Sequence, residues 1–215
     1  RIARGNGHTK VLCQIDNVEP HEHHLTDKPF NRYYLHSVDG FVYMSEQVHS
    51  ELRAYSDAPA LFSPHPLFEN FGERVERSEA CVRLGLDPAN RYVLFFGLIR
   101  DYKGLDLLLD AWAQLRRAGR TEGRRLIVAG EFYTAREPYL NRIADNGLQD
   151  EVLLHDRFIP DDDVKYYFSA ADFVVQPYKT ATQSGVTQIA YQFCVPMVVT
   201  KVGGLAEIVP DGRVG

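Results

Sequence analysis

The chain has little of what would place it in a special class of protein. Its 215 residues include one tryptophan, two methionines and three cysteines, and no uninterrupted apolar run approaches the length that a transmembrane helix needs. Cys13, Cys81 and Cys194 are odd in number, far apart and free of metal-ligand spacing. Such cysteines are typical of reduced thiols that serve as packing residues in a cytoplasmic protein. The sequence therefore argues against a disulfide scaffold and a cysteine-ligated metal site.

The chain also has fewer basic than acidic residues. Lysine and arginine number 24 against 29 acidic residues, which gives a formal net charge of −5 and a pI near 5.9. This balance argues against a general nucleic-acid binder, so we expect no nucleic-acid partner. We interpret basic residues in a site as serving that site alone and not as part of a basic surface. The hydrophobic content of 45% is ample for a packed core.

A regular alternation of strands and helices begins near residue 91. Apolar runs predict strands at residues 92–96, 125–129, 152–154, 173–176 and 197–200, and amphipathic segments predict helices at 105–117, 138–146, 162–170 and 185–193. Continuous apolar strands between amphipathic helices indicate a parallel sheet covered on both faces. Ligands in such sheets bind at the carboxyl ends of strands. The loops after residues 96, 129, 154 and 176 are therefore expected along one edge.

The first 70 residues predict part of a second α/β domain. Strands are expected at residues 10–18, 40–44 and 60–63, and helices at 29–37 and from Ser45 as N-cap to Tyr55. A further helix expected at 73–84 leads into the next domain. Pro64-His65-Pro66, ahead of residues 70–72, is typical of a hinge. We therefore expect residues 1–70 to end an N-terminal domain and residues 71–215 to form most of a C-terminal one.

The loop after residues 173–176 is the first site candidate. Thr182 and Ser184 offer hydroxyls, and Gly185 allows a ligand to approach the backbone closely. The loop leads into a helix N-terminus, whose free N–H groups and dipole attract anions such as phosphate. A second interpretation stays open, in which Thr182 or Ser184 only caps the helix.

A basic pair follows the strand at residues 92–96. Arg100 and Lys103 lie between Gly97 and a predicted helix N-terminus, where cations are electrostatically unfavourable unless an anion arrives. Arginine can fork onto phosphate oxygens and lysine can supply a point charge, so the pair suits a departing diphosphate without a metal ion. The alternative is a pair of solvated surface charges with Asp101 and Asp106 nearby.

These segments resemble a known family. Residues 177–196, Val202-Gly203-Gly204, Glu207 and Asp211-Gly212 resemble the donor-binding domain of the retaining GT-B glycosyltransferases of the large group 1 family. Lys103-Gly104 and Gly130-Glu131 match further glycine turns of that family by their spacing. The resemblance implies a GT-B type α/β fold: a Rossmann-like parallel sheet with helices on both faces, plus the end of a second Rossmann-like domain.

The resemblance also implies site residues. In the family, the cations at the positions of Lys103 and Arg100 act on the donor diphosphate during catalysis. The expected donor-binding residues are Gly97, Ile159, Thr182, Gln183, Ser184, Gly185 and Gln188. Asp16 and His21 would lie on the acceptor side, in a region where relatives carry a histidine followed by Pro-His-Glu. A metal bound by the histidines of residues 21–24 is a weaker alternative, because their spacing does not match a helical zinc pair.

The chain departs from the family pattern at several positions. The two family glutamates fall on Ala181 and Ile189, and Asp16 replaces the family histidine. Arg100 stands three residues after Gly97 where the family has one. Ile189 shares a predicted apolar helix face with Val186, Ala190 and Phe193. We therefore expect Gln183, Ser184 or Gln188 to take over the donor contacts.

The resemblance implies a glycosyltransferase that moves a sugar from a nucleotide-sugar to an acceptor with retention at the anomeric carbon. The expected partners are that donor, which is a substrate and not a cofactor, and a saccharide or lipid-linked acceptor of cell-surface polysaccharide or glycolipid biosynthesis. A cytoplasmic location is expected, with or without peripheral contact to the inner face of a membrane through a missing N-terminal part.

Two other functions remain open at this point. One is a nucleotide-sugar epimerase of similar two-domain fold, and the other is a catalytically silent subunit that binds a nucleotide-sugar. The chain begins at Arg1 without methionine or signal peptide and ends at Gly215 where the family continues. We therefore expect it to be a fragment of a longer protein.

Overall fold

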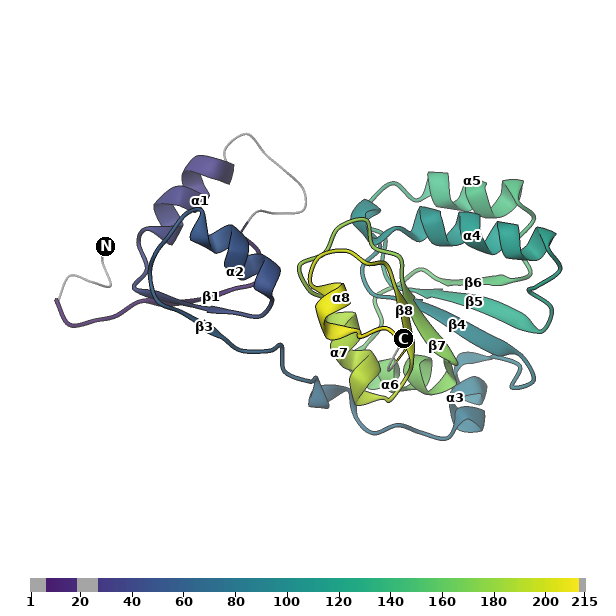
Figure 1. The fold of residues 1–215 in the computed structure, drawn as a ribbon. Helices are drawn as coiled ribbons and strands as arrows, with labels where there is room; N and C mark the ends of the chain where they lie inside the picture. The colour runs from purple at the N-terminus through teal and green to yellow at the C-terminus, as the bar shows by residue number, and fades with distance from the viewer. Residues whose placement is uncertain (1–6, 19–26, 213–215) are drawn as a thin grey trace. The chain divides into compact units, whose positions relative to one another are not determined.

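The computed structural model describes residues 7–18 and 27–212, which divide into two compact units (Figure 1). The first unit comprises residues 1–66 together with 180–184 and 201–208. The second comprises residues 67–179, 185–200 and 209–215. Each unit is built on its own parallel β-sheet. Among the described residues, no helix is long and apolar enough to cross a membrane.

The first unit contains a three-stranded parallel sheet in the order β1-β2-β3. Its elements are β1 (Leu12–Ile15), α1 (Asp27–Leu35), β2 (Gly40–Tyr43), α2 (Glu46–Arg53), β3 (Ala60–Phe62) and the short α8 (Leu205–Ile208). Ser45 caps α2 as expected, because its Oγ accepts a hydrogen bond from Val48 N at 3.3 Å. Val48 and Leu52 then pack with Phe41 in the unit's core.

The second unit contains a five-stranded parallel sheet in the order β6-β5-β4-β7-β8. The strands are β4 (Arg91–Phe96), β5 (Arg124–Ala129), β6 (Val152–His155), β7 (Phe173–Gln176) and β8 (Met197–Val199). The helices are α3 (Arg77–Leu84), α4 (Leu105–Arg117), α5 (Glu137–Asp145), α6 (Asp161–Ala170) and α7 (Gly185–Gln192), with single 3-10 turns η2 (Glu69–Phe71) and η3 (Asp101–Lys103). The alternation expected from the sequence is confirmed.

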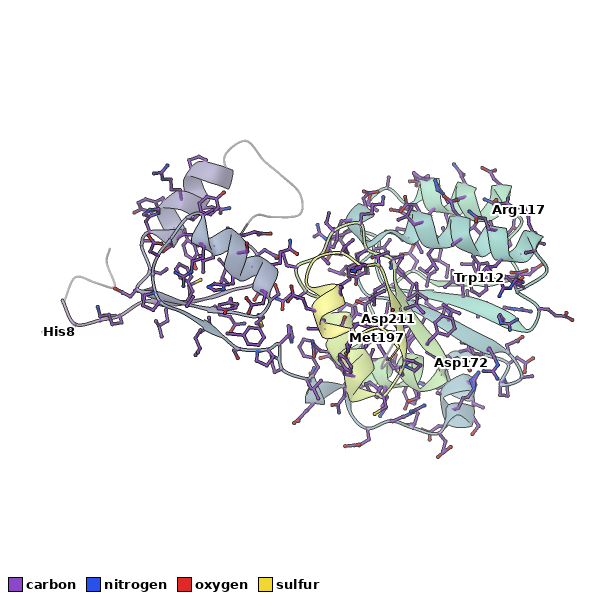
Figure 2. The ribbon with its side chains drawn as sticks, in the orientation of Figure 1. His8, Trp112, Arg117, Asp172, Met197 and Asp211 are labelled. Carbon is purple, nitrogen blue, oxygen red and sulfur yellow. The ribbon has the colours of Figure 1, made fainter. Side chains whose placement is uncertain are left out.

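Helices cover both faces of this sheet: α4 and α5 lie on one, and α3, α6 and α7 on the other (Figure 1). Successive residues of β4 serve the two faces, as strand geometry requires. Phe95 packs with Trp112 of α4, which Figure 2 labels. The next ring, Phe96, lies 5.1 Å from that of Phe168 in α6. The expected α/β fold with a doubly covered parallel sheet is therefore confirmed.

Two local expectations are wrong. The helix expected at 73–84 begins only at Arg77, because the preceding backbone is extended and Val75 N donates to Ser169 Oγ at 3.1 Å. Cys194 is not a packing residue but is exposed, with a φ of 52° in the left-handed region.

Candidate functional site

The loops that follow β4 and β5 are joined at the carboxyl edge of the second sheet. Gly97 N donates to Ala129 O at 2.9 Å, and Ile99 N donates to Glu131 O at 2.7 Å. A Cβ on Gly130 would lie 2.1 Å from Gly97 O, and Gly130 has a φ of 143°. Only glycine fits there, because any side chain would clash with backbone and strain the dihedral. The family-like glycine turn thus brings two loops into contact.

Lys103 folds back over Gly97. It ends the turn η3, and Gly104, with a φ of 69°, leads directly into α4. A Cβ built on Gly97 would lie 3.2 Å from Lys103 Nζ and 3.5 Å from Cγ2 of Val186, in the first turn of α7. The structure therefore brings together a lysine ammonium, a bare backbone glycine and the start of a helix. These are the elements of an anion-binding site.

The Lys103 ammonium is partly withdrawn from water. Burial, with a smaller contribution from the Arg100 guanidinium, lowers the pKa of Lys103 from 10.5 to about 8. Nζ lies 5.7 Å from the centre of the Tyr178 ring, a cation–π contact. Among the described residues, no carboxylate lies within ion-pair distance of Lys103 Nζ. An incoming anion would supply the missing counter-charge.

Arg100 and the two aspartates close to it in sequence have different partners. The Arg100 guanidinium lies 5.2 Å from the centre of the Tyr133 ring, and its backbone precedes η3. Asp101 and Asp106 do not neutralise the basic pair but bind Lys179, at 2.9 and 3.0 Å. The solvated-surface alternative therefore does not describe Lys103. Tyr178 was not foreseen, because nothing in a loop sequence shows which ring will face a lysine.

Helix α7 is buried along most of its length. Val186, Ile189 and Ala190 form the expected apolar face, and Ile189 is only 6% exposed. Gln188 is equally buried. The space above Gly185 is filled from within the protein, because a Cβ there would lie 3.2 Å from a Phe68 ring carbon. That contact gives Gly185 a packing reason, in addition to the ligand approach expected of it.

The polar loop before α7 belongs to the first unit. Thr182 Oγ1 donates a hydrogen bond to Oδ1 of Asn17, the residue after Asp16. Thr182 and Ser184 are buried, and Gln183 Oε1 is buried without a hydrogen-bond partner among the described residues. A side-chain acceptor in that state is available to a ligand hydroxyl.

Gly203 and Gly204 of the Val-Gly-Gly turn lie against the backbone of the polar loop. A Cβ on Gly203 would come within 1.7 Å of Ala181 O, and one on Gly204 within 1.9 Å of Thr182 O. Both approaches exclude any side chain at these positions. The glycines that carry part of the family resemblance therefore have a packing reason inside the first unit.

The remaining expected residues are more dispersed. Asp16 is exposed after β1, and His21 lies outside the described residues. Ile159 is 8% exposed and packs inside the second unit. Sequence reasoning missed a polar pair in the second unit: His155 Nδ1 shares a hydrogen bond of 2.8 Å with Tyr167 Oη. Burial first, and then Arg157, lower the pKa of His155. His155 is the last residue of β6, at the carboxyl edge of the sheet. That position is the sequence feature that could have indicated a site residue.

The sequence matches a family model over more than half its length. The model described as "Glycosyl transferases group 1" matches residues 90–215. A D-inositol 3-phosphate glycosyltransferase of Pseudarthrobacter chlorophenolicus is 32% identical over 140 residues, covering 65% of this chain and 33% of the relative. The lipopolysaccharide core biosynthesis mannosyltransferase LpsB of Rhizobium meliloti is 32% identical over 172 residues, covering 74% and 45%. The chain spans a third to a half of these relatives' lengths.

Solved structures share the fold at lower sequence identity. HepE of Anabaena in complex with UDP-glucose aligns with a TM-score of 0.78 and 19% identity, covering 98% of this chain and 58% of that protein. Sucrose-phosphate synthase of Thermosynechococcus elongatus aligns with a TM-score of 0.74 and 21% identity, covering 90% and 51%. Both likenesses concern the fold.

Proposed function

The chain belongs to the glycosyl transferases group 1 family, and from this premise we propose that the protein containing it transfers a sugar from a nucleotide-sugar donor to an acceptor. The observation that carries the proposal is the position of Lys103. Its ammonium has no carboxylate partner among the described residues and lies against Gly97 and the first turn of α7. A donor diphosphate would supply the counter-charge and accept hydrogen bonds at this edge.

The chemistry assigned to these residues is stabilisation of the leaving group. As the bond between the anomeric carbon and the diphosphate oxygen breaks, negative charge builds on that oxygen. Lys103, with Arg100 beside it, would stabilise that charge more strongly in the transition state than in the ground state, which raises turnover. Because both cations belong to the protein, we propose that transfer requires no divalent metal and no further cofactor.

Three finer features of the proposal rest on resemblance. Retention at the anomeric carbon follows the family pattern described above. A saccharide or lipid-linked acceptor, in cell-surface polysaccharide or glycolipid synthesis, is supported by LpsB, whose name places it in lipopolysaccharide core biosynthesis. A uridine donor is supported by HepE, whose structure holds UDP-glucose. A cytoplasmic location, with or without peripheral membrane contact, remains part of the same proposal.

A second candidate is a silent subunit that binds a nucleotide-sugar. Ala181 and Ile189 stand where the family has glutamates, and Ile189 is buried in the apolar face of α7. These positions therefore offer no carboxylate to hold the donor hydroxyls. Gln183, whose Oε1 is buried without a partner in the described part of the chain, is our preferred substitute.

The test uses the full-length protein with UDP-, GDP- and ADP-sugars, and product analysis separates transfer, epimerisation and binding alone. We expect a new glycoside, formed equally well after EDTA treatment. Lys103→Ala should lower kcat by about 100-fold, since loss of one such charge partner costs roughly 3 kcal/mol in the transition state. Lys165→Ala is the matched control, because Lys165 also lies over a tyrosine ring, 5.2 Å from that of Tyr166. Transfer within threefold of wild type in Lys103→Ala would contradict the assignment.

A further inference from the structure

The turn that carries Lys103 is fastened to the segment that follows β7. Lys179 N donates a hydrogen bond of 2.7 Å to Tyr102 O, the carbonyl immediately before Lys103. A Cβ on Gly104 would lie 2.0 Å from Pro177 O, so the backbones touch on the other side of Lys103 as well. The orientation of Lys103 therefore depends on a loop that lies more than seventy residues further along the chain.

The side chain of Lys179 completes this attachment. Its ammonium lies 2.9 Å from Asp101 Oδ1, at the start of η3, and 3.0 Å from Asp106 Oδ2, in the first turn of α4. One cation thus ties the two elements on either side of Lys103 to each other. Burial acts to lower the pKa of Lys179, but the hydrogen bonds and charges of Asp101 and Asp106 outweigh it, and the net shift is upward. Lys179 therefore remains charged wherever Lys103 does.

The two aspartates also present an electrostatic problem. Two carboxylates beside an anion-binding lysine would repel a diphosphate unless their charge is balanced. Asp106 depends on Lys179 in particular, because its other oxygen, Oδ1, is buried without a hydrogen-bond partner among the described residues. Lys179 is the cation within ion-pair distance of both carboxylates.

We propose that Lys179 is a positioning residue for the donor: by joining Asp101 to Asp106 it fixes the turn that presents Lys103 to the diphosphate. Lys179 acts through Lys103 and does not itself contact the diphosphate. The inference rests on the proposed function, since it assigns a role in the same site.

A purely structural ion pair would behave differently. The Lys179 side chain is 31% exposed, and its partners Asp101 and Asp106 are 75% and 27% exposed. The exposed Asp101 pair adds little to stability, whereas loss of Lys179 leaves the more buried Asp106 carboxylate unpaired and lowers stability as well. A displacement of about 1 Å in a catalytic group can cost roughly 100-fold in rate. Loss of Lys179 should therefore lower catalysis even at temperatures at which the variant is fully folded.

The experiment compares Lys179→Met and Lys179→Arg in the full-length protein. Arg142→Met is the matched control, because Arg142 also pairs with an aspartate of α4, Asp110, at 3.3 Å and is similarly exposed. The measurements are Tm, titration with UDP, GDP and ADP, and kcat/KM as a function of pH with the sugar donor that supports turnover.

We expect Lys179→Met to lower kcat/KM by about tenfold or more, measured below a temperature at which Tm shows the variant to be fully folded, whereas Arg142→Met should keep the wild-type kcat/KM. Lys179→Arg should restore most of the activity. The pH profile adds a readout that stability alone would not move. Release of the turn admits water to Lys103. Because burial is the main cause of the lowered Lys103 pKa, that pKa should rise. The alkaline limb of the plot of kcat/KM against pH should therefore move upward from about pH 8.

Several outcomes would overturn the proposal. If Lys179→Met stays within twofold of wild type while Lys103→Ala loses transfer, Lys179 has no positioning role and the proposed function stands. If Lys103→Ala itself stays within threefold of wild type, the proposed function has failed instead. Should Lys179→Met not fold, Asp106→Asn keeps the side-chain shape and removes one charge that Lys179 binds. It must lower kcat/KM several-fold, or the proposal is wrong.

Discussion

Lys103 is subject to two opposing requirements. An anion-binding lysine has to be charged, yet burial near Gly97 and Val186, aided by Arg100, disfavours that charge and brings its pKa to about 8. In the proposed function, a bound diphosphate would offset this cost. Without it, the buried ammonium lowers the stability of the fold.

The first prediction concerns stability at Lys103. The unfolded state binds more protons than the folded state between pH 8 and 10.5, since the folded pKa is about 8 and the ordinary value 10.5. The contribution of this group to stability is therefore lowest below pH 8 and rises through that window. Lys103→Met should stabilise the protein at pH 7, by on the order of 1–3 kcal/mol, and should remove the rise.

Urea unfolding at pH 7 and pH 10 checks this prediction, with Lys165→Met as control. The control should keep the wild-type pH dependence, because it leaves Lys103 and its buried surroundings unchanged. A Lys103→Met variant less stable than wild type at pH 7 would show that burial does not penalise this ammonium.

Single residues of the site could be predicted from the sequence only where they stand between a predicted strand and the helix that follows it. Lys103 and Gly97 follow an apolar strand and precede a helix, so their place at the sheet edge could be inferred from spacing. Lys179 and Tyr178 carry no such signal, because their partners lie on η3 and are fixed by the three-dimensional path of the loop. Cys194 was misjudged because the sequence does not reveal a left-handed turn.

At the scale of elements, glycines at the carboxyl edge allow the loops to meet. Gly130 approaches Gly97, and Gly104 approaches Pro177, each at a distance that no side chain permits. These contacts place η3 between β4 and the loop after β7. The alternation of strands and helices in the second unit was predictable, because continuous apolar runs mark strands buried on both faces. The start of α3 was not, since it depends on the contact of Val75 N with Ser169 Oγ.

The second prediction tests the contact between the loops. Gly130→Ala should destabilise the chain by about 3 kcal/mol or more, because its Cβ would lie 2.1 Å from Gly97 O and its φ is 143°. Gly119→Ala is the control: Gly119 also has a positive φ, 67°, but nothing lies within 4 Å of its Cβ. It should cost about 1 kcal/mol. Equal losses in urea unfolding would contradict this account of the edge.

The third prediction concerns the buried face of α7. Ile189→Glu restores a family carboxylate but places it among Val186, Ala190 and Phe193, where Ile189 is only 6% exposed. We expect a loss of about 3 kcal/mol or more, since an unpaired carboxylate is costly to bury. Gln192→Glu, at the partly exposed end of α7, should change stability by about 0.5 kcal/mol or less. An Ile189→Glu variant that melts no lower than wild type and binds the donor more tightly would mean that Ile189 faces the ligand.

At the scale of the whole molecule, the described residues form two sheets with separate cores. The first core gathers around Phe41, Val48 and Leu52, and the second around Phe95, Leu126 and Trp112. A sheet with its own buried core is a unit that can unfold by itself. The proposed diphosphate contacts through Lys103, Gly97 and α7 lie on the second unit, whose integrity should therefore decide binding of the diphosphate.

The last prediction separates the two cores by their spectroscopic signals. The single tryptophan of the chain, Trp112, lies in the second unit, so its fluorescence reports that unit, whereas far-ultraviolet circular dichroism reports both. Leu52 is 1% exposed in the first core and Leu126 is 0% exposed in the second. Replacing either with alanine leaves a cavity that costs roughly 2–5 kcal/mol. Leu126→Ala should lower the fluorescence midpoint in urea and weaken UDP binding, whereas Leu52→Ala should lower only part of the dichroism transition. If Leu52→Ala shifted the Trp112 midpoint as far as Leu126→Ala does, the two cores would unfold as one, and diphosphate binding could not be assigned to the second unit alone.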